Sequence, residues 1–268
     1  ILDPILIFGL GLGVMGASLA TALSQLVSFC ALLYLAGKNG GLSIDYHYFK
    51  PQFWHYEEIN AGGLPSLARQ GLGSVATICL NRIAGGYGDA ILAAFSIVNR
   101  YIMFVASILL GYGQGFQPVC GFNYGAKKYE RVQKAFWFTV LVGTIYCCIM
   151  AVLSFAFSPI IVSLFRKGDP DVISYGARIL RYQALALPLM SFTVVTNMYL
   201  QTIKRPVMAS IVAMARQGIV FLPVLFLLNA LLGLQGAMMA QAISDVLALV
   251  LAAPMCFYAL SWMMKKKD

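Results

Sequence analysis

Charged side chains are scarce in this sequence. Only 11% of the 268 residues are Asp, Glu, Lys or Arg, whereas 60% are apolar. Soluble globular domains carry about 25% charged residues, so this chain has too little charge to cover a water-facing surface. The mean hydropathy of +0.79 points the same way. The composition therefore excludes an ordinary soluble domain and requires lipid as the solvent for much of the surface.

Groups that bind metals or perform acid–base chemistry are also few. The chain has 10 acidic residues and two histidines, and its six cysteines form no C-x-x-C pair. An acid–base or Mg²⁺ site needs paired carboxylates or clustered histidines, and a cysteine metal site needs a characteristic spacing. We therefore predict no catalytic residue, no metal site and no cofactor. A membrane-embedded enzyme, such as a prenyl- or acyltransferase, is the least favoured of three function classes.

Long apolar runs are abundant. A helix needs about 20 residues to cross the hydrocarbon core of a bilayer. Unpaired backbone groups are too costly in lipid for irregular structure, and a barrel would need alternating strands instead. We therefore predict an all-α integral membrane protein with about seven transmembrane helices, at about 4–36, 63–84, 90–113, 135–165, 175–202, 207–231 and 235–263.

The basic residues gather in alternate loops. The formal net charge of +9 would suit a nucleic-acid partner, but the positions of the charges argue against one. The loops on one side hold only Arg166 and Lys167. Because basic loops stay in the cytoplasm, we predict a multi-pass protein of the plasma membrane with a cytoplasmic C-terminus. The loops predicted on the cytoplasmic side hold eleven basic residues: Lys38, Lys50, Lys127, Lys128, Arg131, Lys134, Lys204, Arg205, Lys265, Lys266 and Lys267.

A polar segment rich in aromatic residues separates the first span from the other six. We predict that it is a loop at the cytoplasmic membrane interface and that it connects two helical bundles, or lobes. Residues 16–24 and 236–244 share the pattern G-A-x-x-A-x-A-x-S, which suggests that the first and last helices occupy equivalent places in two repeated bundles. Because the chain starts with Ile1, we expect it to be part of a longer protein. The predicted segments are 1–36 (one helix), 37–62 (loop), 63–264 (six-helix bundle) and 265–268 (basic tail).

Two stretches resemble a known family. The first surrounds Gly63 and Pro65, where Pro65 is expected in the first turn of a helix. The second, GYGQGFQPVCGFNYGAKKYERV at 111–132, is similar to the most recognisable segment of the multidrug and toxin extrusion (MATE) transporters, and the general pattern is nearest the MepA-like branch. Its matching positions, expected to be structural, are Gln114, Gly115, Pro118, Gly121, Asn123, Gly125 and Ala126.

The resemblance extends over the whole chain and implies a fold and an activity. It implies the last helix of an N-terminal lobe that is otherwise missing, followed by a complete six-helix C-terminal lobe. It also implies secondary active efflux of amphipathic organic cations by alternating access of two lobes, driven by H⁺ or Na⁺. The NorM-like branch of the family carries carboxylates in the helices that would correspond to 63–84 and 175–202, but these spans contain no Asp or Glu here. The resemblance to other branches therefore implies a coupling site in the missing lobe. The expected partners are the bilayer, small organic cations and that lobe.

Five polar residues inside the spans are the candidate cavity residues: Asn99, Arg100, Arg216, Gln217 and Asp245. A charge at bilayer depth is paired or functional, and both arginines and Asp245 lie about 14–15 Å into their helices at 1.5 Å per residue. We therefore predict that Asp245 pairs with Arg216 or Arg100. The pair is either a static contact or one that changes partner or protonation during transport. Asp245 facing an aqueous cavity alone, as a cation or proton site, is the third possibility.

The two arginines also leave a second function open. A lipid-linked oligosaccharide flippase of the same superfamily is expected to line its cavity with several cationic residues. Arg100 and Arg216 would serve this purpose if both faced the cavity. The positions of these two side chains in the fold therefore bear directly on the choice between drug efflux and lipid flipping.

Overall fold

The computed structural model describes residues 2, 5–9, 11–38, 53–166 and 168–265, and for 53–69 it describes the backbone only. Every regular element in these residues is a helix, which confirms the all-α prediction. Two compact units follow each other along the chain, residues 1–58 and 59–268.

The first unit consists of a short π-helix, η1 (Ile5–Gly9), and the long helix α2 (Gly13–Lys38). Gly11 and Gly13 form the turn between them with φ angles of 67° and 52°, a backbone conformation that glycine adopts without steric cost. Gly16, the first residue of the predicted repeat, lies so close to the carbonyl of Leu6 that a side chain would collide with it.

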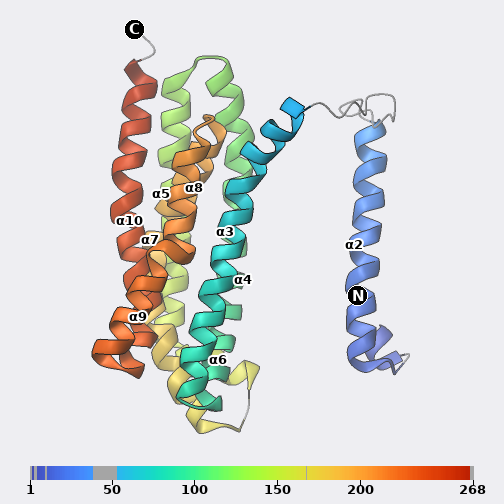
Figure 1. Ribbon diagram of the computed structural model, residues 1–268, viewed down its shortest axis with the longest axis vertical. Coiled ribbons are helices and arrows are strands. Elements are labelled where there is room, and N and C mark those ends of the chain that lie inside the picture. Colours follow the sequence, from blue (N-terminus) through green and yellow to red (C-terminus); the bar gives the residue numbers. More distant parts are fainter. Residues whose placement is uncertain (1, 3–4, 10, 39–52, 167, 266–268) are drawn as a thin grey trace. The chain divides into compact units, whose positions relative to one another are not determined.

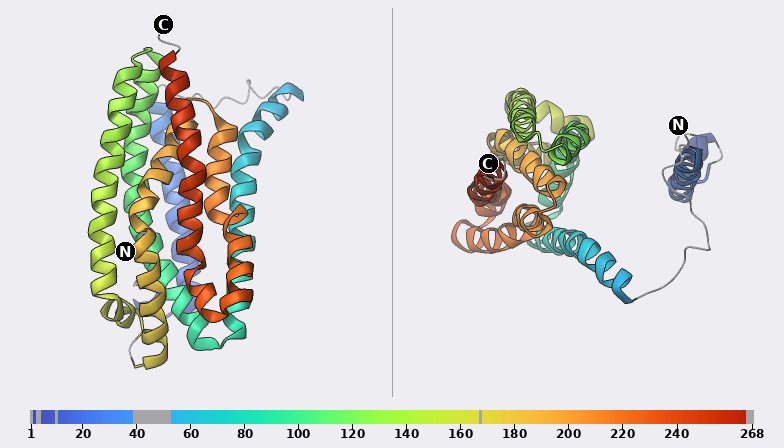
Figure 2. Two further views of the ribbon diagram at one scale, coloured as in Figure 1. Left: turned by 90° about the vertical axis from the view of Figure 1, so that its left-hand side faces the viewer. Right: turned by 90° about the horizontal axis from the view of Figure 1, so that it is seen from above.

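The second unit is a bundle of long helices that run side by side (Figure 1). The turns α4–α5 and α7–α8 and the C-terminal end of α10 lie at one end of this bundle, and the turn α9–α10 lies at the other (Figures 1 and 2). The elements are α3 (Phe53–Gly86), α4 (Asp89–Gly125), α5 (Tyr129–Ala156), α6 (Ser158–Phe165), α7 (Pro170–Thr202), α8 (Pro206–Met214), η3 (Ala215–Ile219), α9 (Phe221–Leu232) and α10 (Leu234–Lys265).

Helix α7 is the centre of the bundle. Of the 18 consecutive residues that form its most apolar stretch, 61% are buried, whereas the corresponding stretches of the other spanning helices of this unit are 28–39% buried. Its buried side chains include the small residues Gly176, Ala184 and Ser191, and Gly143 of α5 lies against the Ser191 side chain. Small residues let helix backbones approach closely, so α7 can contact α4, α5 and α10 together.

Six helical segments of the described residues are long and apolar enough to cross a membrane. The chain is therefore a multi-pass membrane protein, and six of the seven predicted spans are confirmed. The remaining predicted span, 63–84, lies inside α3, of which only residues 70–86 have described side chains. The six segments are Gly13–Leu35, Asp89–Gly125, Tyr129–Ala156, Pro170–Thr202, Pro206–Leu232 and Leu234–Met264.

The structure corrects the predicted start of α3 and the predicted place of Pro65 within it. The segment 37–62 was predicted to be a loop, but α3 already begins at Phe53. Residues 53–61 contain neither glycine pair nor proline, so nothing in their sequence interrupts a helix. Pro65, predicted in a first turn, consequently lies well inside α3. The surroundings of Gly63 and Pro65, and the remainder of the predicted loop, lie outside the described side chains.

Four other spans differ from their predicted form. The predicted span 4–36 is not one helix, because a turn at Gly11 and Gly13 separates η1 from α2. Helix α4 continues through the family motif to Gly125, about 18 Å beyond the predicted end at residue 113. The predicted span 135–165 divides into α5 and α6 at Phe157, next to Pro159 in the first turn of α6. The predicted span 207–231 is divided by the π-helix η3.

Both copies of the predicted repeat lie in helices, α2 and α10. Gly236 in α10 makes the same kind of contact as Gly16, since a Cβ at this position would collide with the carbonyl of Leu228 in the preceding helix. In each copy the glycine therefore permits close contact with the helix that precedes it in the chain, η1 for Gly16 and α9 for Gly236.

Candidate functional site

A cavity of about 780 Å³ lies in the second unit, lined by side chains from α3, α4, α7, α8, η3, α9 and α10. Amide side chains are the commonest polar groups of its lining, and Arg216 and Asp245 are the charged ones among the described lining residues. The amides are Gln70, Asn99, Gln183, Asn197, Gln217 and Gln241.

An ion pair joins two of the lining helices. Arg216 Nε of η3 donates to Asp245 Oδ1 of α10 at 2.9 Å, and the two side chains are 22% and 12% exposed. Gln241 Nε2 donates to the same oxygen at 3.2 Å, and Arg216 Nη2 contacts Met190 Sδ at 3.3 Å. The predicted pairing of Asp245 is therefore confirmed, with Arg216 as the partner.

The π-helix that carries Arg216 has an identifiable cause. A proline ring clashes with the carbonyl four residues earlier, and for Pro223 that carbonyl belongs to Ile219, the last residue of η3. The chain widens just before this point, and Val220 N donates to Ala215 O, five residues back, at 3.1 Å. Such π turns are frequent at functional sites. Here the wider turn places Arg216 and Gln217 on the cavity wall.

Glycines allow η3 to lie close to α3. A Cβ on Gly218 would overlap the side chain of Leu72, and a Cβ on Gly73 would lie 3.7 Å from Gln217 Oε1. The close contact brings the amide of Gln217 into the wall of the cavity beside α3.

The structure separates the five predicted cavity residues. Asn99, Arg216, Gln217 and Asp245 line the cavity. Arg100 is exposed and is not among the described lining residues, although it directly follows Asn99. Successive helical residues point about 100° apart, and here the rotation of α4 turns Asn99 toward the cavity and Arg100 away from it.

Four amides of the lining were not predicted, namely Gln70, Gln183, Asn197 and Gln241. Gln241 precedes Asp245 by four residues on α10 and donates to it, a spacing that identifies helical neighbours from sequence alone. Gln183 of α7 is 6% exposed, and its Oε1 has no hydrogen-bond partner among the described residues. No sequence signal distinguishes this glutamine from a packed one, because its state depends on the helices around it.

The family motif forms the last turns of α4. A Cβ built on Gly121 would lie 3.4 Å from Thr202 Cγ2 of α7, at van der Waals distance, so this position lies at the contact between α4 and α7. Asn123 Nδ2 donates to the carbonyl four residues earlier at 2.8 Å, and its own carbonyl accepts from Lys128 N at 2.9 Å. These contacts close the end of α4, as a structural motif requires. Pro118 lies inside the helix, and the exposed motif residues are Gln114, Gly115, Pro118, Gly125 and Ala126.

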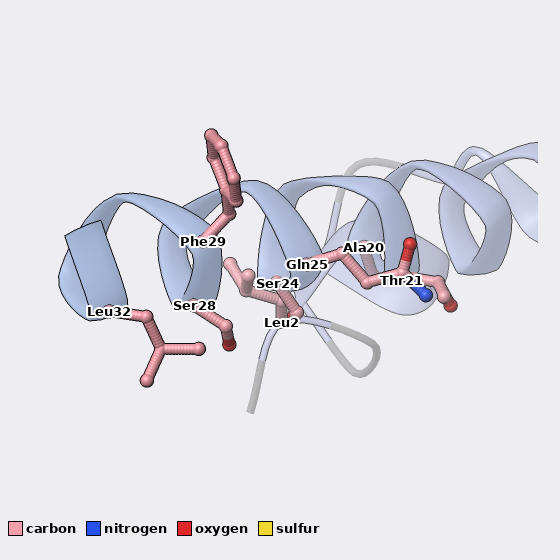
Figure 3. A pocket seen from close by; sticks show the side chains of 8 residues that line it. All are labelled: Leu2, Ala20, Thr21, Ser24, Gln25, Ser28, Phe29 and Leu32. Atoms are coloured by element: carbon pink, nitrogen blue, oxygen red, sulfur yellow. The ribbon is translucent and has the colours of Figure 1, made fainter. Parts of the chain in front are cut away.

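A second hollow, of about 500 Å³, lies in the first unit and runs along one face of α2 (Figure 3). Its lining includes Thr21, Ser24, Gln25 and Ser28, whose spacing places them on one side of the helix. None of the predicted cavity residues lies here. Small polar side chains on one helix face suit contact with other membrane helices.

Comparisons with known proteins agree on one family. The MatE family model matches residues 65–227. The multidrug export protein MepA of Staphylococcus haemolyticus is 32% identical over 253 residues, which are 94% of this chain and 55% of that protein. The chain thus spans about half the length of the curated relatives that it matches, and these relatives are named as exporters.

Solved structures show the same fold. An outward-facing multidrug resistance MATE family transporter of the MOP superfamily has a TM-score of 0.84 at 25% identity, over 98% of this chain and 60% of that one. A MOP superfamily transporter from Pyrococcus furiosus, described as having a binding pocket of reverse polarity that suggests a different function, also has a TM-score of 0.84, at 26% identity and with the same coverage.

Proposed function

This chain belongs to the MatE family, and we propose that it is part of a secondary multidrug exporter. In this proposal it supplies the last helix of the N-terminal lobe and the whole C-terminal lobe. The complete transporter moves amphipathic organic cations outward by alternating access of the two lobes, with H⁺ or Na⁺ moving inward. The relatives named as multidrug export proteins support this assignment.

The observation that carries the proposal is the ion pair in the cavity wall. A charge inside a membrane protein is costly unless it is paired or faces water, and such charges mark substrate and ion pathways. Asp245 and Arg216 meet both conditions, because they pair at 2.9 Å and both line the cavity. Both side chains are therefore placed where the polar groups of a substrate can reach them.

The coupling site is assigned to the missing lobe. Asp245 is the one cavity-lining carboxylate among the described residues, and Arg216 already occupies it. The second lobe is thus proposed as the obligatory partner, since alternating access needs two bodies that rock against each other.

The orientation follows from the basic residues. Lys127, Lys128, Lys204 and Arg205 lie in the α4–α5 and α7–α8 turns, at the same end of the bundle as the C-terminal end of α10 (Figure 1). Because basic loops remain in the cytoplasm, we assign this end to the cytoplasmic side of the plasma membrane.

The flippase alternative is less well supported. It needs several cationic side chains in the cavity, but Arg100 is not among the described lining residues and Arg216 is neutralised by Asp245. The described lining residues thus lack the net positive charge that a phosphate-bearing lipid head group would require.

The test is an export assay with the full-length transporter in cells that lack their main efflux pumps. Cells carrying the native protein should survive higher concentrations of organic cations, and Asp245→Asn should remove most of this protection at equal expression. Asp171→Asn is the matched control, because Asp171 is exposed in the first turn of α7. Unchanged drug sensitivity combined with depletion of a lipid-linked precursor would favour the flippase instead.

A further inference from the structure

In the part of the cavity wall that the structure describes, one positive and one negative side chain cancel. Arg216 and Asp245 are the charged groups among its described lining residues. A simple organic cation therefore meets no net negative charge. To reach Asp245 fully it would have to displace Arg216, and removing one partner of a buried ion pair leaves an uncompensated charge that is strongly unfavourable.

The pair nevertheless has unused hydrogen-bonding positions. Both described hydrogen bonds to Asp245 end on Oδ1, from Arg216 Nε and Gln241 Nε2. A carboxylate has a second oxygen, and a guanidinium has five N–H donors. In the described residues Oδ2 of Asp245 and Nη1 of Arg216 make no hydrogen bond. A ligand can thus bind both charged groups while the pair stays intact.

The rest of the lining favours dipolar groups over isolated cations. Six amides surround the cavity, and each offers both a donor and an acceptor. The oxygen of Gln183 is buried without a partner in the described residues, which is costly unless a ligand supplies a donor. Phe221 is the aromatic side chain of the described lining, so the wall has little capacity for cation–π binding.

We propose that this cavity binds zwitterionic amphiphiles in preference to the corresponding simple cations. The ligand's ammonium group contacts Asp245 Oδ2, its carboxylate contacts the free edge of the Arg216 guanidinium, and the amides hold neighbouring polar atoms. The opposite charges of ligand and protein then meet head to tail, and no charge is left unpaired. This inference rests on the proposed export function and specifies the ligand class of the same cavity.

The test uses three ligands built on one apolar, fluorescent scaffold. The first is a zwitterion with an ammonium and a carboxylate, the second its methyl ester (a cation), and the third its N-acetyl derivative (an anion). Binding to the purified full-length transporter is measured by fluorescence titration. Because a hydrogen bond to a charged group is worth roughly 1.5–3 kcal/mol, the zwitterion should bind about tenfold to a hundredfold more tightly than either relative.

Two variants show whether the preference arises at this pair. Arg216→Gln leaves the cavity with one negative charge and should shift the preference to the ester, whereas Asp245→Asn should shift it to the N-acetyl ligand. Arg216→Lys, which keeps the charge, should retain the preference for the zwitterion and guards against loss through misfolding. The Asp171→Asn protein should behave as the native one.

Distinct results separate this inference from the proposed function. An ester that binds the native transporter as tightly as the zwitterion, or a preference that ignores both charge-removing variants, overturns the zwitterion proposal. Export of organic cations would still stand in that case. A full-length protein that protects cells against no drug of any charge class overturns the export function itself.

Discussion

Removing the carboxylate of Asp245 should destabilise the protein far more than removing both members of its ion pair. At an effective dielectric constant of 20, two unit charges about 4 Å apart attract by about 4 kcal/mol. The Asp245→Asn variant loses this attraction and leaves the Arg216 guanidinium unpaired with only 22% of its side chain exposed. Breaking a buried pair in this way costs about 3–5 kcal/mol.

The double variant Arg216→Gln with Asp245→Asn should recover much of this loss. It leaves two neutral amides that can hydrogen-bond to each other and to Gln241, which already lies 3.2 Å from Asp245 Oδ1. The net loss should then fall to about 1–2 kcal/mol, since a neutral hydrogen bond contributes about 1 kcal/mol. The double-mutant cycle is expected to give a coupling energy of at least 2 kcal/mol.

The assay is thermal unfolding of the purified full-length transporter in detergent, with the four proteins of the cycle measured side by side. The single variants should unfold at clearly lower temperatures than the double variant. Additive effects of the two single substitutions would refute the reasoning, because they would mean that the two side chains do not interact in the folded protein. Repeating the cycle at high salt should change little, since a partly buried pair is poorly screened.

Two further predictions concern helix packing and orientation. Gly236→Ala should destabilise the protein by about 1–3 kcal/mol, because the new Cβ overlaps the Leu228 carbonyl. Gly111→Ala is the control and should be neutral or stabilising, because no atom lies within 4 Å of its Cβ. Equal unfolding temperatures of the two variants would contradict the packing of Gly236 against Leu228. In a cysteine-free background, Lys128→Cys should react with a membrane-impermeant maleimide only from the cytoplasmic side and Arg166→Cys only from outside, and the reverse pattern would overturn the orientation.

The apolar spans were predictable because crossing a bilayer is a local demand. About 20 apolar residues in sequence suffice to identify a span, so six of the seven predicted spans are found in the described helices. A partner for Asp245 was predicted on the same basis, since an intramembrane carboxylate is costly unless it is paired or faces water. Few arginines lie inside the predicted spans, so the sequence left Arg216 and Arg100 as the candidate partners. The structure shows that the partner is Arg216.

The helix boundaries that failed depend on less local effects. The sequence 207–231 is apolar apart from a few polar residues, Arg216 and Gln217 among them, and its mean hydropathy gives no sign of the π-helix at Ala215–Ile219. That turn reflects the clash between Pro223 and the carbonyl four residues before it, together with the contact of Gly218 with Leu72 of another helix. The proline can be recognised in the sequence of a single span. Whether the helix responds with a kink or with a π turn depends on the neighbouring helix, which the span itself does not contain.

The choice between Arg216 and Arg100 shows what the sequence alone determined and what it left open. The sequence determined that both arginines lie at about the same depth, because depth follows from counting residues at 1.5 Å each. Only the tertiary structure decided that Asn99 faces the cavity while Arg100 does not, and that Gln183 and Gln241 join the site. Those outcomes depend on how each helix is rotated about its axis, and rotation is set by the packing of all the helices together.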